Sequence, residues 1–231
     1  MKRNFSLDLA RTFAIVLMVI FHFIYDLKFF GWVNWDIPDG EGWKQFRWII
    51  ITLFFLCLGL SLTLAHKQGF RAKKFVTRVA QISGGALIIS LTSYFAIPEN
   101  WIFFGVLHFL ALASLICIFF INMPKLSFVI GIGFIVLGIS ELIHPRWPFY
   151  LLVEGLPNYT NDYVALVPWL GMVFFGISLA HTQWFHKDPL STYNRLASNQ
   201  VLIWPGQHSL SIYLLHQPII MGTMFIIKTV L

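Results

Sequence analysis

Long apolar runs dominate this chain, and they constrain its fold more than any other feature. A helix that crosses a bilayer needs about 20 apolar residues, and several runs approach that length. The mean hydropathy is +0.74 and only 11% of the 231 residues are charged, compared with about 25% in soluble domains. The sequence therefore predicts an all-α, polytopic transmembrane helix bundle that forms a single domain over residues 1–231.

Seven spans are expected, with polar or turn-rich joints between them. They cover residues 8–31, 48–65, 75–97, 102–121, 126–143, 163–181 and 208–228. The first joint, residues 31–48, is polar and rich in Trp, which is typical of a membrane interface. Within the longest polar stretch, residues 189–204 are expected to form a surface helix that Pro205 and Gly206 end.

The distribution of Lys and Arg predicts how the spans are oriented. A cytoplasmic N-terminus puts eleven basic residues on the cytoplasmic side: Lys2, Arg3, Arg11, Lys67, Arg71, Lys73, Lys74, Arg78, Lys125, Lys187 and Arg195. Five then face the other side: Lys28, Lys44, Arg47, Arg146 and Lys228. This ratio favours a cytoplasmic N-terminus. Because the basic residues lie mainly at span ends, the net charge of +6 does not indicate nucleic-acid binding.

Four ionisable residues lie in the first expected span: Asp8, Arg11, His22 and Asp26. Such residues are costly in a bilayer and usually face a cavity or a partner. At about 100° per residue, the other three fall within about 60° of Arg11 around the helix axis, so all four share one stripe. The alternative is a stripe of satisfied polar residues that only packs against another helix. Four ionisable groups together favour a functional site.

Three intramembrane histidines are expected at similar depths. At about 1.5 Å per residue, His22 lies about 13 Å and His108 about 10 Å below the outer face, and His216 about 12 Å above the inner face. If the hydrocarbon core is about 30 Å thick, the three histidines lie within about one helix diameter of each other along the membrane normal. Lateral neighbours do not follow from the sequence.

Asp26 lies one helical turn after His22 and could accept a hydrogen bond from the imidazole, which would orient the ring and raise its basicity. The alternative is an intrahelical pair that only lets the histidine tolerate lipid. At the cytoplasmic end, Arg11, Arg78 and the basic residues of 67–74 suit a phosphate-bearing ligand. Anionic lipid or the positive-inside rule alone would also explain them. The sequence has no Cys/His zinc spacing, and no metal is expected.

Several segments are similar to one known family. The opening "RNFSLDLARTFAIVLMVIFHFIYDL" (3–27) resembles the start of the heparan-α-glucosaminide N-acetyltransferase catalytic-domain-like family, with a basic residue, Asp-x-x-Arg, an apolar stretch and then Phe-His and Asp-Leu. Further similar segments are "FFLCLGLSLTLA" (54–65), "KKFVTRVAQI" (73–82), "FGVLHFLALASL" (104–115) and "IWPGQHSLSIYLLHQPI" (203–219). The spacing of eleven between Arg11 and His22 also resembles the membrane acyltransferase-3 proteins, whose members usually have more spans.

The resemblance implies a membrane enzyme that takes an acyl group from cytoplasmic acetyl-CoA or another acyl-CoA. The group would pass to an amino or hydroxyl group of a sugar-containing acceptor at the outer face. The catalytic positions that match are His22, Asp26 and His108. The positions implied for binding the acyl donor are Arg11, Arg78, His216, Ser209 and Tyr213. His22 would be the base, Asp26 its orienter, and Arg11 and Arg78 the anchors for CoA; Gln217 also falls on a motif position.

Two positions depart from the family pattern. Thr12 stands where Gly usually follows the Arg, and the outer loop 32–47 has no histidine, although the animal enzyme has an essential one there. The base would therefore be His22 or His108. Both direct transfer and a transient acyl-histidine stay open.

A proton-coupled membrane transporter is the alternative function, because intramembrane Asp and His residues are also typical of proton pathways. No matching pair of Gly/Pro-broken spans supports it, and a non-catalytic membrane scaffold is a third possibility. The expected location is a bacterial-type inner (plasma) membrane, with several passes. The expected partners are the lipid bilayer and a glycan or other envelope acceptor, with a homo-oligomer left open.

Overall fold

The computed structural model describes residues 4–152, 156–157, 160, 162–190, 192 and 197–230. Regular secondary structure over these residues is entirely helical, which confirms the all-α prediction. Lys2, Arg3 and Arg195, three of the basic residues used to predict the orientation, lie outside the described residues. The cytoplasmic N-terminus stays a prediction.

Among the described residues, four helices are long and apolar enough to cross a membrane. They are α1 (Phe5–Phe29), α2 (Trp43–His66), α3 (Ala72–Ala96) and α10 (Ser209–Val230). Each overlaps one of the expected spans, residues 8–31, 48–65, 75–97 and 208–228. These four spans could be predicted from the sequence because each apolar run is bounded by clear polar or turn residues.

The other three expected spans correspond to shorter apolar helices. They are α4 (Val106–Cys117), continued by the 3₁₀ turn η2 (Ile118–Phe120), α5 (Pro124–Ile139) and α7 (Leu170–Ala180). The expected span 163–181 begins too early, because residues 163–169 are not in a helix and Pro168 lacks the N–H that a continuous helix would use. The 11 residues of α7 rise about 16 Å, about half of a hydrocarbon core. Seven full spans stay a prediction.

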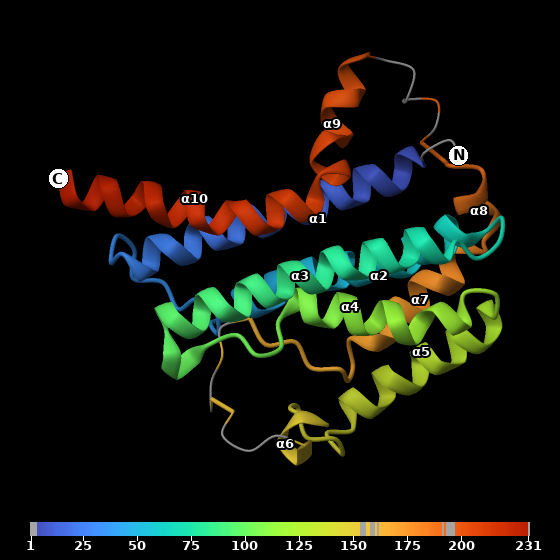
Figure 1. The fold of residues 1–231 in the computed structure, drawn as a ribbon, viewed down its shortest axis with the longest axis horizontal. Helices are drawn as coiled ribbons and strands as arrows, with labels where there is room; N and C mark the ends of the chain where they lie inside the picture. Colours follow the sequence, from blue (N-terminus) through green and yellow to red (C-terminus); the bar gives the residue numbers. More distant parts are fainter. Residues whose placement is uncertain are drawn as a thin grey trace. The chain divides into compact units, whose positions relative to one another are not determined.

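The chain folds into two compact units. The first comprises Met1–Phe54 and Lys187–Leu231, and the second comprises Phe55–His186. The first contains α1, the start of α2, α9 (Ala197–Gln207) and α10. The second contains the rest of α2, then α3 to α8, with the short elements η1 (Pro98–Asn100), α6 (Phe149–Leu152) and α8 (Gln183–His186). In the first unit α10 runs beside α1, so helices from opposite ends of the chain are neighbours (Figure 1).

Close helix contacts at glycine organise the second unit. A Cβ on Gly59 of α2 would clash with the backbone of α7, and a Cβ on Gly176 of α7 would clash with the backbone of α2. Small residues allow this backbone-to-backbone approach between helices in membranes. Beside this contact the rings of Phe55 and Phe109 stack with their centroids 4.0 Å apart, and both side chains are fully buried.

A similar approach joins α1 and α9 in the first unit. A Cβ on Gly206 would clash with the carbonyl oxygen of Asp8, and the N–H of Gly206 donates to Oγ1 of Thr12 over 2.9 Å. A helix is present where a surface helix was expected, but the expectation that Pro205 and Gly206 end it is wrong, because α9 continues through both residues to Gln207. Gly206 marks the point where α9 meets α1, not the end of a helix.

The first turn of α1 is held by Asp188. Its carboxylate accepts hydrogen bonds from the N–H groups of Phe5 (2.9 Å) and Ser6 (3.0 Å) and from the hydroxyl of Ser6 (2.6 Å). Asn4 caps the same turn by accepting from the N–H of Leu7 over 2.8 Å. First-turn N–H groups have no partner within the helix, and a negative charge there interacts favourably with the helix dipole. Asp188 therefore fixes where α1 begins.

Replacing Asp188 with glycine is expected to destabilise the protein by about 1–2 kcal/mol, the usual cost of losing a helix cap. Glycine is the chosen substitution because Asp188 has a φ of 47°, which glycine adopts without strain. The measurement is thermal unfolding in detergent, with Asp39→Gly, which removes an exposed carboxylate from the loop between α1 and α2, as the control. Equal melting temperatures for the two variants would contradict the capping role.

Candidate functional site

Two imidazoles from opposite ends of the chain meet between α1 and α10. The ring centroids of His22 and His216 lie 4.8 Å apart, with an interplanar angle of 75°. His216 is 8% exposed, and His22 is half-buried. The sequence predicted that both rings lie deep in the membrane, and the fold adds that they are lateral neighbours.

The backbone around each ring decides which nitrogen carries the hydrogen. Nδ1 of His22 lies 2.9 Å from the carbonyl oxygen of Met18, and Nδ1 of His216 lies 2.8 Å from that of Tyr213. A carbonyl oxygen only accepts, so Nδ1–H donates in both rings and Nε2 holds the lone pair when the ring is neutral. Both histidines are thus fixed in the tautomer that can accept a proton at Nε2.

Asp26 has a different partner from the one expected. Its Oδ1 accepts a hydrogen bond from Nε2 of Gln217 over 2.8 Å, whereas Nδ1 of His22 is bound to its own helix. The orienting hydrogen bond from His22 to Asp26 is therefore absent from the described contacts. Spacing along one helix allowed that bond, but a neighbouring helix supplied a better donor. Sequence reasoning placed Gln217 on a motif position without finding this role.

At the other end of α1 a second polar cluster forms around Asp8. Asp8 is 4% exposed, and its Oδ1 accepts from Nη1 of Arg11 in a 3.0 Å salt bridge. Nε2 of Gln207 lies 3.4 Å from the other carboxylate oxygen. Thr12, the departure from the family pattern, accepts the N–H of Gly206. The predicted stripe of α1 therefore makes polar contacts with α9 at one end and with α10 at the other.

Three predicted residues of α10 lie on one face, because Ser209, Tyr213 and His216 follow the i, i+4, i+7 spacing. Tyr213 is 9% exposed, and its ring centroid lies 5.8 Å from that of His216 and 6.4 Å from that of Phe54 on α2. Ser209 begins the helix and is half-buried. This face holds His216 against α1.

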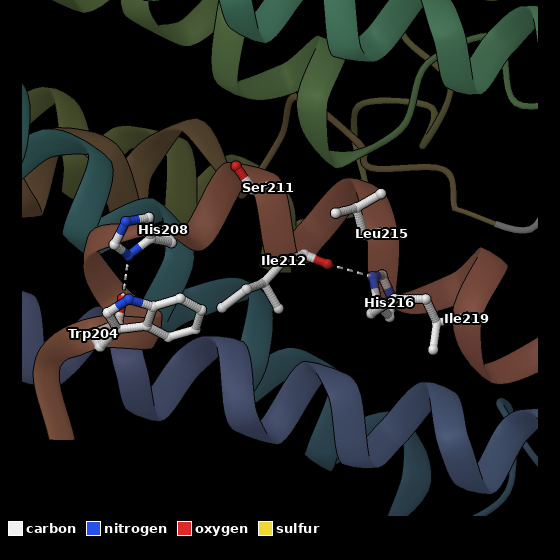
Figure 2. Close-up of a pocket in the computed structure, with 7 residues that line it drawn as sticks. All are labelled: Trp204, His208, Ser211, Ile212, Leu215, His216 and Ile219. Atoms are coloured by element: carbon white, nitrogen blue, oxygen red, sulfur yellow. Dashed lines mark hydrogen bonds between the residues drawn. The ribbon is translucent and has the colours of Figure 1, made fainter. Parts of the chain in front are cut away.

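A groove of about 250 Å³ runs along α9 and α10 (Figure 2). It is lined by Trp204, His208, Ser211, Ile212, Leu215, His216 and Ile219. Figure 2 shows Trp204 and His208 at one end and His216 towards the other end. The rings of Trp204 and His208 are stacked, with their centroids 4.6 Å apart. The groove is largely apolar, and His216 belongs both to it and to the histidine pair.

His108 lies in the second unit, where both ring nitrogens are occupied. Nδ1 accepts from the N–H of Gly105 over 3.2 Å, and Nε2 lies 3.1 Å from Oγ of Ser90. The hydroxyl of Ser90 itself donates to the carbonyl of Ile102 over 2.6 Å, so Nε2–H must donate to Oγ. His108 therefore has the opposite tautomer to His22 and has no nitrogen left to take a proton. Ser90 is a residue that sequence reasoning missed.

Arg78 is also in the second unit, on α3, where its side chain is exposed beside Lys73 and Lys74 earlier on the same helix. The described residues hold no group of three or more His, Cys, Asp or Glu side chains placed to bind a metal ion. The residues brought together in the first unit are thus Asp8 with Arg11, and His22 with His216.

A comparison with family models gives one match. The model described as "Heparan-alpha-glucosaminide N-acetyltransferase, catalytic" matches residues 3–218. No curated protein and no solved structure matches the chain. The matched range includes the four ionisable residues of α1, the face of α10 and His108. The chain therefore belongs to the heparan-alpha-glucosaminide N-acetyltransferase catalytic family, a membership that indicates the activity of a membrane acetyltransferase.

Proposed function

We propose that this protein transfers an acetyl group from cytoplasmic acetyl-CoA to an amino or hydroxyl group of a sugar-containing acceptor at the outer face of the membrane. One observation carries the proposal: His22 and His216 meet at 4.8 Å, each with Nδ1 bound to its own helix. Such an arrangement presents a fixed, proton-accepting Nε2 inside a membrane enzyme of this family.

His22 is the proposed base. The sequence left His22 and His108 as candidates, and the two nitrogens of His108 are already engaged by Gly105 and Ser90. Nε2 of His22 makes no hydrogen bond with any described residue, so it is open to a substrate N–H or O–H. His108 is better suited to holding the start of α4 in place.

The proposed donor site runs from Arg11 towards the histidines. Arg11 and His22 are separated by about 16 Å along the helix axis, which is comparable to an extended pantetheine arm. The salt bridge to Asp8 keeps the guanidinium group at that end of α1, where it can bind phosphate. The groove from Trp204 to His216 offers an apolar path for the arm beside α10. Ser209 and Tyr213, which lie in the same unit as Arg11, stay proposed contacts of the donor, and a role for Arg78 stays an implication of the family resemblance.

The proposed chemistry needs one proton acceptor. Nε2 of His22 removes the proton from the acceptor amine or hydroxyl as that group attacks the thioester carbonyl. The new C–N or C–O bond forms, the C–S bond breaks, and the thiolate of CoA takes up the proton held on Nε2 of His22, which returns the imidazole to its neutral form. His216, in ring contact with His22, stabilises the imidazolium that forms. Asp26 and Gln217 lie one turn further along the same interface.

The test is acetyl transfer from radiolabelled acetyl-CoA by the purified protein to a panel of amino sugars and envelope glycans. Labelled glycan should form with wild type and depend on acetyl-CoA. In parallel, CoA at 100 times its dissociation constant should stabilise the protein by about 2.7 kcal/mol against thermal unfolding. If the protein transfers no acetyl group, is not stabilised by CoA and supports proton-coupled flux in liposomes, the results would favour a transporter instead. Label retained on the quenched protein would indicate an acyl-histidine.

Replacing Arg11 with glutamine is expected to raise the KM for acetyl-CoA by about 10- to 100-fold, because a charged hydrogen bond to phosphate contributes about 1.5–3 kcal/mol. kcat should change little, since Arg11 is remote from the reacting atoms. Lys125→Gln, which removes an exposed cation from the same predicted side, is the control. A fall in kcat with an unchanged KM would exclude Arg11 as an anchor for the donor.

A further inference from the structure

Two buried acceptor oxygens lie one turn beyond the histidine pair. Asp26 is 1% exposed, and its Oδ1 accepts from Nε2 of Gln217 over 2.8 Å. The other oxygens of this pair, Oδ2 of Asp26 and Oε1 of Gln217, are also buried, and neither makes a hydrogen bond with a described residue. Buried acceptors without a donor are costly, and a buried carboxylate is more so.

No cation compensates for a charge on Asp26 in the part of the chain that the structure describes. The salt bridge recorded there joins Arg11 to Asp8, at the opposite end of α1. Lys28 donates instead to the carbonyl of Ile37 over 2.7 Å, and Lys228 donates to that of Phe30 over 3.2 Å. The titratable groups nearest in sequence on the two helices, His22 and His216, direct Nδ1–H to their own backbones.

We infer that Asp26 carries a proton and forms a neutral carboxylic acid–amide pair with Gln217. A protonated carboxyl group has one donor and one acceptor oxygen, and a primary amide has a donor nitrogen and an acceptor oxygen. Oδ2–H of Asp26 donates to Oε1 of Gln217, and Nε2–H of Gln217 donates to Oδ1 of Asp26. A single proton thereby satisfies both orphaned oxygens without any other partner.

This pair positions the histidines. Gln217 follows His216 directly on α10, and Asp26 lies one turn after His22 on α1, so two hydrogen bonds across the interface fix how the helices align. Asp26 and Gln217 are then positioning residues that act through the two imidazoles, and Asp26 does not act as a charge on His22. Only this catalytic consequence rests on the proposed function.

The first test is infrared spectroscopy of the detergent-solubilised protein at neutral pH. Wild type should show the C=O stretch of a protonated carboxylic acid, which is distinct from carboxylate and amide bands. The band should vanish in Asp26→Asn and return in the reciprocal double variant Asp26→Asn/Gln217→Glu, which moves the acid to α10. A wild-type spectrum identical to that of Asp26→Asn in this region would overturn the inference.

The second test compares thermal unfolding. Asparagine and glutamine can also form two antiparallel hydrogen bonds, so Asp26→Asn should melt close to wild type. Asp26→Leu leaves the amide of Gln217 unpaired, and Gln217→Leu leaves the acid of Asp26 unpaired. Each variant should therefore melt about 5 °C below wild type. Thr223→Val, at an exposed position of α10, is the control. An Asp26→Asn variant as unstable as Asp26→Leu would show that the negative charge is needed.

Acetyl transfer then separates positioning from folding. Asp26→Leu should lower kcat by at least tenfold with little change in the KM for acetyl-CoA, and Asp26→Asn should recover most of that loss with an unshifted pH profile. An Asp26→Asn variant that lowers kcat as far as Asp26→Leu, or shifts the pH profile, would contradict the positioning role. If wild type transfers no acetyl group, the proposed function fails, while the infrared band and the melting temperatures still decide whether the pair exists.

Discussion

Replacing His22 with alanine is expected to lower acetyl transfer by about 10²–10⁴-fold, the usual contribution of a general base. The loss should appear in kcat, because the imidazole acts on the proton that leaves during the reaction and not on the CoA phosphates. CoA should still raise the melting temperature of the variant, since Arg11 and the groove are intact. The measurements are initial rates with labelled acetyl-CoA and thermal unfolding with and without CoA.

His144→Ala is the matched control for this variant. His144 is an exposed histidine of the second unit, and its Nδ1 accepts from the N–H of Arg146 over 3.1 Å. Its removal deletes an imidazole that neither belongs to the histidine pair nor lines the groove, and transfer should stay within about twofold of wild type, as for most surface substitutions. A His22→Ala variant that keeps wild-type kcat would eliminate His22 as the base. A shared loss in both variants would indicate general damage to the fold instead.

Replacing Gly206 with alanine is expected to prevent normal packing of α9 on α1. The added Cβ would clash with the carbonyl oxygen of Asp8, and backbone atoms cannot move aside as a flexible side chain can. Overpacking of this kind costs about 1–3 kcal/mol and sometimes more. The bond from Gly206 to Thr12 and the contact of Gln207 with Asp8 should be lost together. Expression, monodispersity and melting temperature in detergent report the effect.

Gly222→Ala supplies the control for this substitution. Gly222 lies in α10, and a Cβ there would meet nothing within 4 Å. Alanine has the higher helix propensity, so this variant should be as stable as wild type or slightly more stable. Equal stability of Gly206→Ala and Gly222→Ala would mean that α9 does not approach α1 as closely as described.

Helix positions were largely predictable, because apolar runs and their boundaries are local properties of the sequence. The start of α7 was not, since the apolar residues before Pro168 look like part of a span although the backbone there is not helical. Gly206 was misread for a related reason. A Pro-Gly pair usually signals a turn, and only the neighbouring helix α1 reveals that the glycine is needed for a close contact.

Sequence reasoning could propose residues for the candidate site, but it could not predict which of them would contact one another. Periodicity put His22 and Asp26 on one stripe of α1, and that placement agrees with both residues facing α10. Periodicity could not show that the His216 ring would contact that of His22 or that Gln217 would donate a hydrogen bond to Asp26. Lateral contacts between helices depend on the tertiary fold. The hydrogen bond that occupies Nε2 of His108 was also not predictable, because its partner Ser90 lies on another helix.

The pairing of α1 with α9 and α10 has a consequence for biosynthesis. Asp26 and Gln217 are 191 positions apart, and Asp8 and Gln207 are 199 positions apart. Domains begin to fold while the chain is still being synthesised, yet α1 must wait in the bilayer until nearly all later segments have been inserted. During that interval its polar stripe lacks its final partners. A chain whose synthesis stops before α9 would therefore keep Asp8 and Asp26 without their partners from α9 and α10.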